Sequence, residues 1–347
     1  MERINMNFET RHPLQPYWNA AAAPLQAQAL DQALEHGLFD ALAREPARAV
    51  EVAQRLALEP RATALWLDLL WSMALLQRHV GQDSAGPRYL ASPLARQFFA
   101  GQAAQACAQA WRYRADLLAA MAASWPELLR DGVKPQGPAA PRGSWAQAAR
   151  VQIGQEQTAV TAPAVLRLLQ SLPPLPSQGR FLDLGGGPGH VAIALAQALP
   201  QWHGEVWDEP ETAGVAQENI VRAGLQARLG ARGCDLNRDF PGGGYGLIWC
   251  SAVLHFLSDP QAALAAMARG LAPGGRLLLA HAEQTDDPAL AAQVLPFYGA
   301  LRLRGNYLPQ AGEIAAGMRQ AGLQSVECLG RCDFPMAPVW VYAGQRA

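Results

Sequence analysis

The 347-residue sequence has few charged residues and a single lysine. Charged residues make up 16% of the chain, and 28 Lys+Arg against 29 Asp+Glu leave a formal net charge of −1. This balance argues against a nucleic-acid-binding protein, which typically has a basic face. Lys134 lies in Gly-Val-Lys-Pro-Gln, which is neither a phosphate-binding P-loop nor a desolvated position for a Schiff base. The sequence therefore excludes these two types of site.

Long apolar runs and paired cysteines are also missing. No apolar run reaches the roughly 18 residues of a membrane-spanning helix, and the first ten residues lack the pattern of a secretory signal. The five cysteines are scattered, and Cys328 and Cys332 alone, without a second pair of ligands, are a weak zinc motif. We therefore expect a cytoplasmic protein with no membrane segment, no nucleic-acid partner and no metal site.

The first hundred residues have the apolar spacing of short amphipathic helices. The predicted elements are helices over 25–36, 50–58 and 62–76, a turn over 81–87 and an extended segment over 88–90. Three helices followed by a β-wing are typical of a winged-helix module. The third helix begins with Arg61 and is otherwise apolar, whereas a DNA-recognition helix carries basic residues. We predict that residues 1–100 form a winged-helix-like dimerisation domain, with a DNA-binding regulator as an alternative.

The rest of the chain changes from helices to alternating strands and helices. Residues 101–172 are predicted to be a helical linker and substrate-covering region, in which glycines and prolines over 131–144 form a loop. The predicted strands are 181–184, 204–208, 227–234, 246–250 and 275–280, and the predicted helices between them are 191–199, 212–223 and 260–271. This alternation is typical of an α/β fold with a parallel, doubly wound sheet, which we predict for residues 173–347.

A glycine-rich loop joins the first of these strands to its helix. Five of the eight residues from Asp183 to His190 are Gly or Pro. Glycines let the backbone approach a ligand closely, and the start of the helix offers free N–H groups. A dinucleotide-binding G-x-G-x-x-G loop would need glycine where His190 stands, so that interpretation fails. The loop instead has the pattern D-x-G-x-G-x-G.

Acidic residues follow the next two strands. Asp208 ends the second strand, where a carboxylate can accept hydrogen bonds from both vicinal hydroxyls of a ribose. Asp235 ends the third strand, where it could accept from an adenine amino group. Placed together at the carboxyl edge of consecutive strands, the two carboxylates favour an adenosine site.

These motifs resemble the class I S-adenosylmethionine-dependent O-methyltransferases of the two-domain, dimeric type, which modify plant phenolics and bacterial secondary metabolites. The similar segments, which extend over essentially the whole chain, are Ala33–Asp40, Asp183–Gly189, Asp208–Pro210, Gly233–Asp235, Leu254–Asp259 and Pro273–Leu277. The resemblance implies a Rossmann-like catalytic domain, S-adenosylmethionine as cofactor with S-adenosylhomocysteine as product, and a homodimer formed by the N-terminal domain. The residues it implies for the cofactor are Asp183, Gly185, Gly187, Gly189, Asp208, Glu209, Asp235, Leu236 and Ser251.

The resemblance also implies a catalytic base, His255. An imidazole with a pKa near 6.5 can accept the proton of a phenol with a pKa of about 10 as the methyl group transfers. The glutamate that orients this histidine in plant members is replaced by His281, and Glu283, two residues further on, could face the same side if the strand continues. Asn306 stands near the family's second glutamate. We therefore expect His255, Glu283 and Asn306 to form the catalytic group.

The expected substrate is a small aromatic or polyketide-like metabolite in a pocket between the domains. The residues expected to line it are Trp145, Ile153, Phe256, Phe297, Tyr298 and Leu301, and aromatic walls suit a flat ring. Methylation of a hydroxyl is the predicted reaction, and the sulfonium of the cofactor requires no metal. Two alternatives stay open: a nitrogen or sulfur acceptor, and a non-methylating pericyclase or decarboxylase of the same fold.

Overall fold

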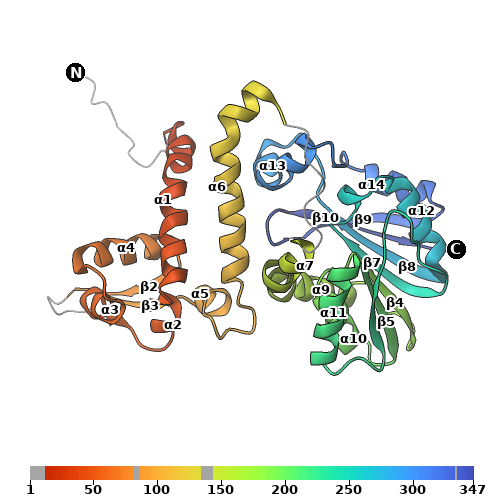
Figure 1. Cartoon of the computed structure of the whole chain (residues 1–347), viewed down its shortest axis with the longest axis horizontal. Helices are drawn as coiled ribbons and strands as arrows, with labels where there is room; N and C mark the ends of the chain where they lie inside the picture. Colours follow the sequence, from red (N-terminus) through yellow and green to blue (C-terminus); the bar gives the residue numbers. More distant parts are fainter. Residues whose placement is uncertain (1–11, 81–85, 134–143, 333) are drawn as a thin grey trace, which may run out of the picture. The chain divides into compact units, whose positions relative to one another are not determined.

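The computed structural model describes residues 12–80, 86–133, 144–332 and 334–347. Two compact units, Met1–Ala108 and Gln109–Ala347, make up the chain (Figure 1). Most of the turn predicted at 81–87 and of the loop predicted at 131–144, including Lys134, lies outside the described residues. Within the described ranges, no helix is long and apolar enough to cross a membrane.

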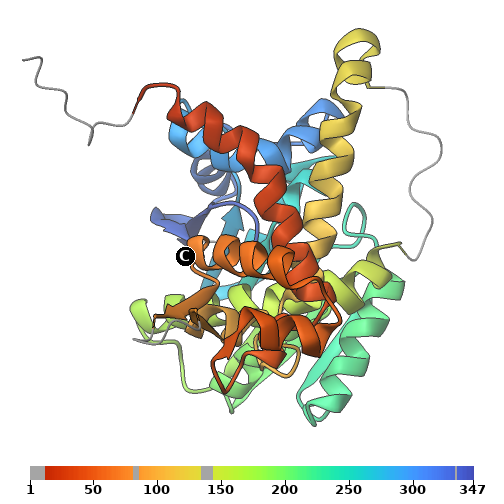
Figure 2. The ribbon, with the colours of Figure 1, turned by 90° about the vertical axis from the view of Figure 1, so that its left-hand side faces the viewer.

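The first unit is helical with a small sheet. Its elements are α1 (Gln15–Glu35), α2 (Leu38–Ala41), β1 (Ala47–Arg48), α3 (Ala49–Leu56), α4 (Pro60–Ser72), β2 (Leu76–His79), β3 (Arg88–Ala91) and α5 (Pro93–Phe98). The strands pair antiparallel in the order β1-β3-β2. Helix α1 contacts α4, which Figure 2 shows in red and orange. This is the helical module with a β-wing that the sequence predicted.

Helix α4 is shorter than predicted. We expected it to continue to residue 76, but it ends at Ser72. Ala74 has a left-handed φ of 59°, which an α-helix cannot contain, and Leu76 pairs with Ala91 in the sheet. The prediction was wrong here because apolar residues at 75 and 76 fit the helical spacing as well as a strand.

The second unit contains the large sheet. The elements of this unit, with α6 beginning one residue before it, are α6 (Ala108–Asp131), α7 (Ser144–Ala148), η1 (Ala149–Ile153), α8 (Gly154–Glu156), η2 (Gln157–Thr161), α9 (Ala162–Ser171), β4 (Gly179–Leu184), α10 (His190–Ala198), β5 (Trp202–Asp208), α11 (Pro210–Arg222), β6 (Leu229–Gly233), β7 (Tyr245–Ser251), η3 (Leu254–Phe256), α12 (Pro260–Gly270), β8 (Leu271–His281), α13 (Pro288–Leu303), α14 (Glu313–Gln320), β9 (Gln324–Cys332) and β10 (Val339–Gln345). The strand order is β6-β5-β4-β7-β8-β10-β9.

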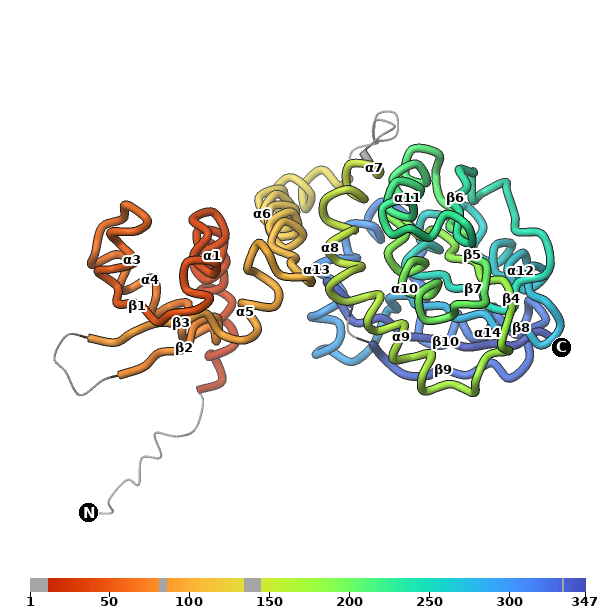
Figure 3. Tube along the Cα trace, turned by 90° about the horizontal axis from the view of Figure 1, so that it is seen from below, coloured from red at the N-terminus to blue at the C-terminus, as the bar shows by residue number. Residues whose placement is uncertain are grey.

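Helices cover both faces of this sheet, as the predicted Rossmann-like fold requires. On one face, α9, α10 and α11 bury a cluster that includes Val165, Leu195 and Ile220. On the other face, α12 and α14 bury a cluster that includes Met267 and Met318. Figure 3 labels these five helices around the strands of the sheet. The strands are apolar on both sides because neither face meets water.

The sheet is mixed, because its last two strands are antiparallel. β10 runs antiparallel to both β8 and β9, whereas β4 to β8 pair in parallel. The sequence pattern did not predict β9 and β10. β9 is an edge strand whose residues are mostly exposed, so it has no continuous apolar run that would indicate a strand.

Candidate functional site

The parallel strands bring the predicted cofactor residues to one edge of the sheet. Asp183 pairs in register with Val206 of β5 and with Trp249 of β7. Asp208 and Ser251 are the last residues of those two strands. The carboxyl ends of β4, β5 and β7 therefore meet where open α/β sheets bind their ligands.

The glycine loop folds back on the end of β5. Gly185, Gly187 and Gly189 have φ values of 67°, 57° and 79°, a left-handed region that side chains disfavour. The N–H of Gly185 donates to the carbonyl of Trp207 at 2.7 Å, and the N–H of Gly187 donates to Oδ2 of Asp208 at 2.8 Å. Gly185 and Gly187 thus hold the loop against the strand that carries Asp208, while the N–H of Gly189 donates to the carbonyl of Gly186 within the loop.

The same loop contacts the turn that carries His255. A Cβ atom added at Gly185 would lie 2.2 Å from Cγ2 of Val253. Val253 directly precedes η3, which contains His255, and follows Ala252, whose φ of 55° turns the chain at the end of β7. Glycine at 185 therefore lets the loop and this turn pack in direct contact.

Two carboxyl groups near the loop have raised pKa values. Asp183 is 2% exposed, and burial together with the charge of Asp208 raises its pKa to about 7. Burial also raises the pKa of Asp208 to about 6, although the N–H groups of Gly187 and Glu209 act in the opposite direction. Ionising both carboxyl groups is costly while they share a desolvated edge, so a cationic ligand would stabilise them.

Unsatisfied polar atoms also indicate a ligand at this edge. Oδ2 of Asp183 and Oγ of Ser251 are buried and make no hydrogen bond to any described residue. Buried polar atoms are rarely left in that state unless a ligand, ion or water completes them. Each oxygen of Asp208 accepts one backbone N–H and keeps a second lone pair. These residues thus fit a ligand that carries a ribose and positive charge, as S-adenosylmethionine does.

The remaining predicted cofactor residues lie on the rim of this edge. Glu209 is exposed, and its N–H donates to Oδ1 of Asp208 at 2.8 Å. Asp235 is exposed, and its Oδ1 accepts from the N–H of Asn237 at 3.0 Å. Leu236 is half-buried and packs against the core. The N–H of Cys234 donates to the carbonyl of Asp208 at 2.9 Å, which joins the ends of β5 and β6.

Gln157, which the sequence did not single out, connects the glycine loop to a neighbouring helical segment. Its Nε2 donates to the carbonyl of Gly186 at 3.0 Å, and its Oε1 accepts from the N–H of His190 at 3.0 Å. Gln157 lies where α8 gives way to the π-helical η2, and η1 before α8 is also π-helical. π-Helical turns shift the faces of a helix, so the apolar spacing predicted a helix but not which side chain would reach the loop.

His255 contacts His281 rather than either predicted partner. Nδ1 of His255 lies 3.2 Å from Nε2 of His281. The carboxylate of Glu283 instead accepts from the hydroxyl of Tyr342 at 2.6 Å. Nδ2 of Asn306 donates to the backbone carbonyl of His255 at 2.8 Å, not to its ring. In this arrangement Asn306 braces the turn, and His281 is the side chain next to the imidazole.

Aromatic rings surround His255. The ring of Phe256 lies 4.0 Å from that of His255 and 4.9 Å from that of Trp145, in both cases edge to face. Tyr298 of α13 lies 5.8 Å from His255. Ile153 is half-buried on η1, and a Cβ added at Gly187 would lie 3.4 Å from its Cγ2. Phe297 and Leu301 pack in the cluster that contains Tyr298.

The hydroxyl of Tyr298 is another buried polar atom without a partner among the described residues. Burial raises the pKa of Tyr298 to about 12, so the hydroxyl keeps its proton at neutral pH. Arg114 and Glu156 lie close enough to influence it, and they form a two-point ion pair at 2.8 and 3.0 Å. A protonated, unpaired hydroxyl beside His255 can donate a hydrogen bond to a bound molecule.

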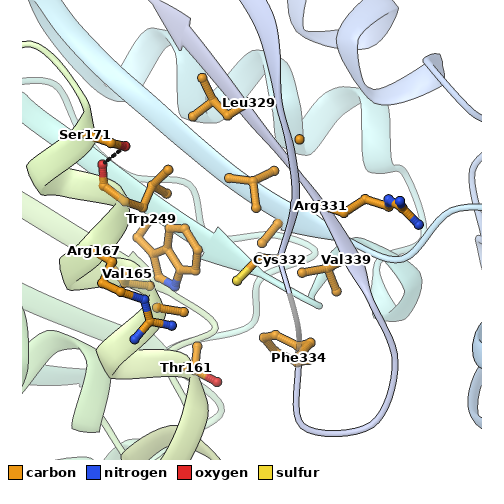
Figure 4. Close-up of a pocket in the computed structure, with 15 residues that line it drawn as sticks. Thr161, Val165, Arg167, Ser171, Trp249, Leu329, Arg331, Cys332, Phe334 and Val339 are labelled. Atoms are coloured by element: carbon orange, nitrogen blue, oxygen red, sulfur yellow. Dashed lines mark hydrogen bonds between the residues drawn. The ribbon is translucent and has the colours of Figure 1, made fainter.

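Two cavities in the second unit are lined neither by the glycine loop nor by His255. A cavity of about 260 Å³ lies between α9 and the β9–β10 hairpin, with Arg167, Trp249 and Cys332 on its walls (Figure 4). None of the predicted site residues lines it. A second cavity of about 290 Å³ is lined by Glu283 and Arg302, among others. Across the described ranges, no three His, Cys, Asp or Glu side chains form a metal-binding group.

Both units match known families. Residues 155–328 match the family described as a methyltransferase domain, and residues 18–101 match the O-methyltransferase dimerisation domain. The chain belongs to the two-domain S-adenosylmethionine-dependent O-methyltransferases. The sequence resemblance, the fold class and the cofactor that it implied are therefore confirmed.

Several methyltransferases are similar to the chain in sequence. It is 28% identical over 273 residues to 3-hydroxy-5-methyl-1-naphthoate 3-O-methyltransferase of Streptomyces sahachiroi, and the aligned residues cover 76% of this chain and 75% of that protein. It is 31% identical over 219 residues to N,N-dimethyltransferase OxyT of Streptomyces rimosus, which covers 62% of each. Acetylserotonin O-methyltransferase of Mus musculus is 30% identical over 263 residues, with 70% of this chain and 66% of that protein covered. The chain thus spans three quarters of the first protein and less than two thirds of the second.

Solved structures share the fold. Human N-acetylserotonin methyltransferase in complex with S-adenosylmethionine superposes with a TM-score of 0.75 at 18% identity, covering 99% of this chain and 100% of that one. CalO1, a methyltransferase of calicheamicin biosynthesis with S-adenosylhomocysteine bound, gives a TM-score of 0.73 at 18% identity, with 97% and 100% covered. At such identities the similarity demonstrates the fold alone.

Proposed function

We propose that the protein transfers the methyl group of S-adenosylmethionine to a hydroxyl of a small aromatic metabolite, with His255 as the general base. The observation that carries this proposal is the position of the buried His255, in the turn that contacts the glycine loop and beside the rings of Phe256 and Tyr298. The similar naphthoate 3-O-methyltransferase, which acts on an aromatic hydroxyl by its name, supports the choice of acceptor.

The site residues have two roles, which are to bind the cofactor and to accept a proton. The bound cofactor supplies a methyl group on a positively charged sulfur, which leaves as a neutral thioether. Asp208 accepts hydrogen bonds from the ribose hydroxyls through its remaining lone pairs, and Asp183 and Ser251 complete their hydrogen bonding with polar groups of the same ligand. His255 accepts the proton of the acceptor hydroxyl as the new bond to carbon forms.

The aromatic groups orient the acceptor. Trp145, Phe256 and Tyr298 present ring faces and edges, which suit a flat ring. The Tyr298 hydroxyl donates a hydrogen bond to an oxygen of the acceptor that is not methylated, because this buried donor otherwise has no partner in the described chain. The proposed acceptor therefore carries a second oxygen near its reacting hydroxyl.

Replacing His255 tests the base. We expect His255→Ala to lower kcat by roughly 10²- to 10⁴-fold, the usual contribution of a general base, and to leave the Kd of S-adenosylmethionine unchanged in calorimetry. The assay is a screen of hydroxylated aromatic acids and quinones with methyl-labelled cofactor. The matched control is His203→Ala, since His203 is exposed on β5.

The same assay distinguishes the alternatives. S-Adenosylhomocysteine should accumulate one for one with product. Turnover without S-adenosylhomocysteine would indicate a non-methylating enzyme of the same fold. A product that carries the label on an amine or thiol would show that the methyl acceptor is nitrogen or sulfur. Undiminished turnover by His255→Ala would remove the base from the proposal.

We further propose that the first unit forms a homodimer, with a small molecule as the second partner of the enzyme. The match to a dimerisation domain supports the dimer. Large apolar side chains on this unit are at least half exposed, as expected of a surface that a second copy covers. They are Leu14, Tyr17, Trp18, Leu25, Leu65, Val80 and Leu94.

A further inference from the structure

Two histidines lie face to edge beneath the proposed acceptor site. His255 comes from η3 after β7, and His281 is the last residue of the neighbouring strand β8. Their rings are 5.1 Å apart at 68°, and 3.2 Å separates Nδ1 of His255 from Nε2 of His281. Both are buried, at 4% and 0% exposure. At this distance one nitrogen must donate and the other must accept.

The backbone determines which nitrogen donates. Nδ1 of His281 lies 2.7 Å from the carbonyl oxygen of Ala282. A carbonyl oxygen can only accept, so Nδ1 of His281 carries the hydrogen. In a neutral imidazole the other nitrogen then has the lone pair, so Nε2 of His281 accepts and Nδ1 of His255 donates. The lone pair of His255 is consequently on Nε2.

We infer that His281 is a positioning residue that holds His255 in the tautomer with a free Nε2 lone pair, and that this neutral pair restricts the enzyme to hydroxyls acidified by electron-withdrawing groups. The inference rests on the proposed role of His255 as base. It concerns the orientation of the base and the acidity of the acceptor, neither of which the family match specifies.

The restriction to acidic hydroxyls follows from what surrounds the pair. When Nε2 of His255 takes the acceptor proton, the ring becomes a cation whose Nδ1–H still donates to His281. The titratable groups that face the two rings are Tyr298 from α13 and Tyr307, whose ring is 6.3 Å from His281. Both phenols are protonated, since burial raises their pKa values. Glu283, the next carboxylate along the chain, is bonded to Tyr342.

Among the described residues that face the pair, a cation formed here therefore meets dipoles and no opposite charge. A carboxylate partner normally stabilises an imidazolium, whereas His281 offers a neutral lone pair. In agreement with this geometry, burial lowers the pKa of His255 to about 3 and that of His281 to about 4. Proton transfer from an ordinary phenol, with a pKa of about 10, is then strongly uphill, and a more acidic hydroxyl reduces that cost.

Nitrogen-15 NMR of histidine-labelled protein tests the tautomer directly. In the wild-type protein we expect His255, assigned by the loss of its signals in His255→Ala, to show a protonated Nδ1 and an unprotonated Nε2 at neutral pH. His281→Leu should leave a mixture of both tautomers, because it removes the acceptor. His281→Gln should retain the wild-type tautomer, because Oε1 can replace Nε2 as acceptor.

Kinetics of the same variants test the positioning role. His281→Leu should lower kcat roughly 10- to 100-fold, as removal of an outer partner of a functional histidine does, with little change in the Kd of S-adenosylmethionine. His281→Gln should recover most of that loss. His281→Glu should move the acidic limb of the kcat/KM profile to higher pH, because a carboxylate raises the pKa of His255. It should also raise the rate with weakly acidic phenols relative to acidic ones.

The outcomes separate this inference from the proposed function. The positioning role is overturned if the wild-type spectrum has hydrogen on Nε2 of His255, or if His281→Leu and His281→Glu keep full kcat and an unchanged pH profile. In that case an inactive His255→Ala still supports His255 as the general base. Undiminished turnover by His255→Ala overturns the base instead, whatever the spectrum contains. Equal rates across phenols of different acidity overturn the proposed restriction. If the leucine variant fails to fold, the wild-type spectrum and the glutamine and glutamate variants decide.

Discussion

The carboxyl groups at the strand ends connect cofactor binding to pH. The folded pKa values of Asp183 and Asp208, about 7 and about 6, exceed the ordinary value of about 3.9. The folded apo-protein thus binds their protons more tightly than the unfolded chain does. Their contribution to stability is present below about pH 4 and is lost as the pH rises through about 6 and 7.

A cationic cofactor reverses that preference, because it binds the ionised carboxylates. We predict that the Kd of S-adenosylmethionine decreases between about pH 5 and pH 8 and that binding releases protons. Calorimetry in buffers of different ionisation enthalpy measures both. Asp183→Asn should weaken binding and flatten the pH dependence, while Glu211→Gln, an exposed change on α11, should do neither. A Kd independent of pH in that range would contradict the prediction.

The Tyr298 hydroxyl gives a second prediction for a single residue. Tyr298→Phe removes the unpaired buried donor and keeps the ring that faces His255. We expect the KM of the acceptor to rise roughly 5-fold, since a neutral hydrogen bond contributes about 1 kcal/mol. Stability should be unchanged or slightly higher. The control is an acceptor without a second oxygen, whose KM should be the same for the wild-type protein and for Tyr298→Phe. If the substitution changes the KM of no acceptor, the proposed contact is ruled out.

At the scale of elements, the Arg114–Glu156 pair joins α6 to α8. Glu156 is 8% exposed, so Arg114→Ala leaves a nearly buried carboxylate without its partner. We predict a loss of about 2–4 kcal/mol in the free energy of unfolding, somewhat less than the about 3–5 kcal/mol for breaking a fully buried pair, because Arg114 is 22% exposed. The double variant Arg114→Met with Glu156→Leu should lie within about 1 kcal/mol of wild type.

Urea denaturation followed by tryptophan fluorescence measures these differences. A single variant as stable as wild type, or a double variant less stable than the single one, would contradict the assignment of the loss to an uncompensated charge.

Periodicity predicted most elements but not the contacts that depend on other parts of the chain. The glycine loop and Asp208 could be found because strand ends and turn residues are local patterns. Glu283 was expected to face His255 on the assumption that the strand continues. The chain leaves β8 at His281, so alternation no longer applies two residues later. Gln157 could not be found, because π-helical turns determine which way it points.

At the scale of the whole molecule, the sequence predicted a helical dimerisation domain and a Rossmann-like domain, and both are present. The boundaries at residues 100 and 172 stay predictions. The antiparallel β9 was beyond reach of the sequence, because an exposed edge strand is defined by its neighbour rather than by its own apolar residues. β10 lies between β8 and β9 and is mostly buried, and its residues Val339–Ala343 form an apolar run, so the sequence carried a signal for this strand that was not used.

The proposed dimer leads to a prediction on α1. Tyr17 and Trp18 are 72% and 66% exposed, and buried aromatic residues commonly dominate the free energy of an interface. Trp18→Asp should weaken the dimer at least about 30-fold, which corresponds to a loss of about 2 kcal/mol. Sedimentation equilibrium gives the dissociation constant, and Gln28→Asp, an exposed change on the same helix, is the control. An unaltered dimer in the Trp18 variant would exclude α1 from the interface.

The contact between Gly185 and Val253 constrains how the enzyme can acquire new acceptors. A side chain at 185 would displace Val253 and with it the turn that carries His255. Substitutions at Gly185 or Val253 therefore alter cofactor binding and proton transfer together, and few such changes would improve both. Directed evolution toward other substrates should succeed more often at Trp145, Phe297 and Leu301, which lie on helices outside these two turns. The contact at Gly185 therefore marks the two turns as a region where substitutions are poorly tolerated, whereas the helices that line the proposed acceptor site can vary.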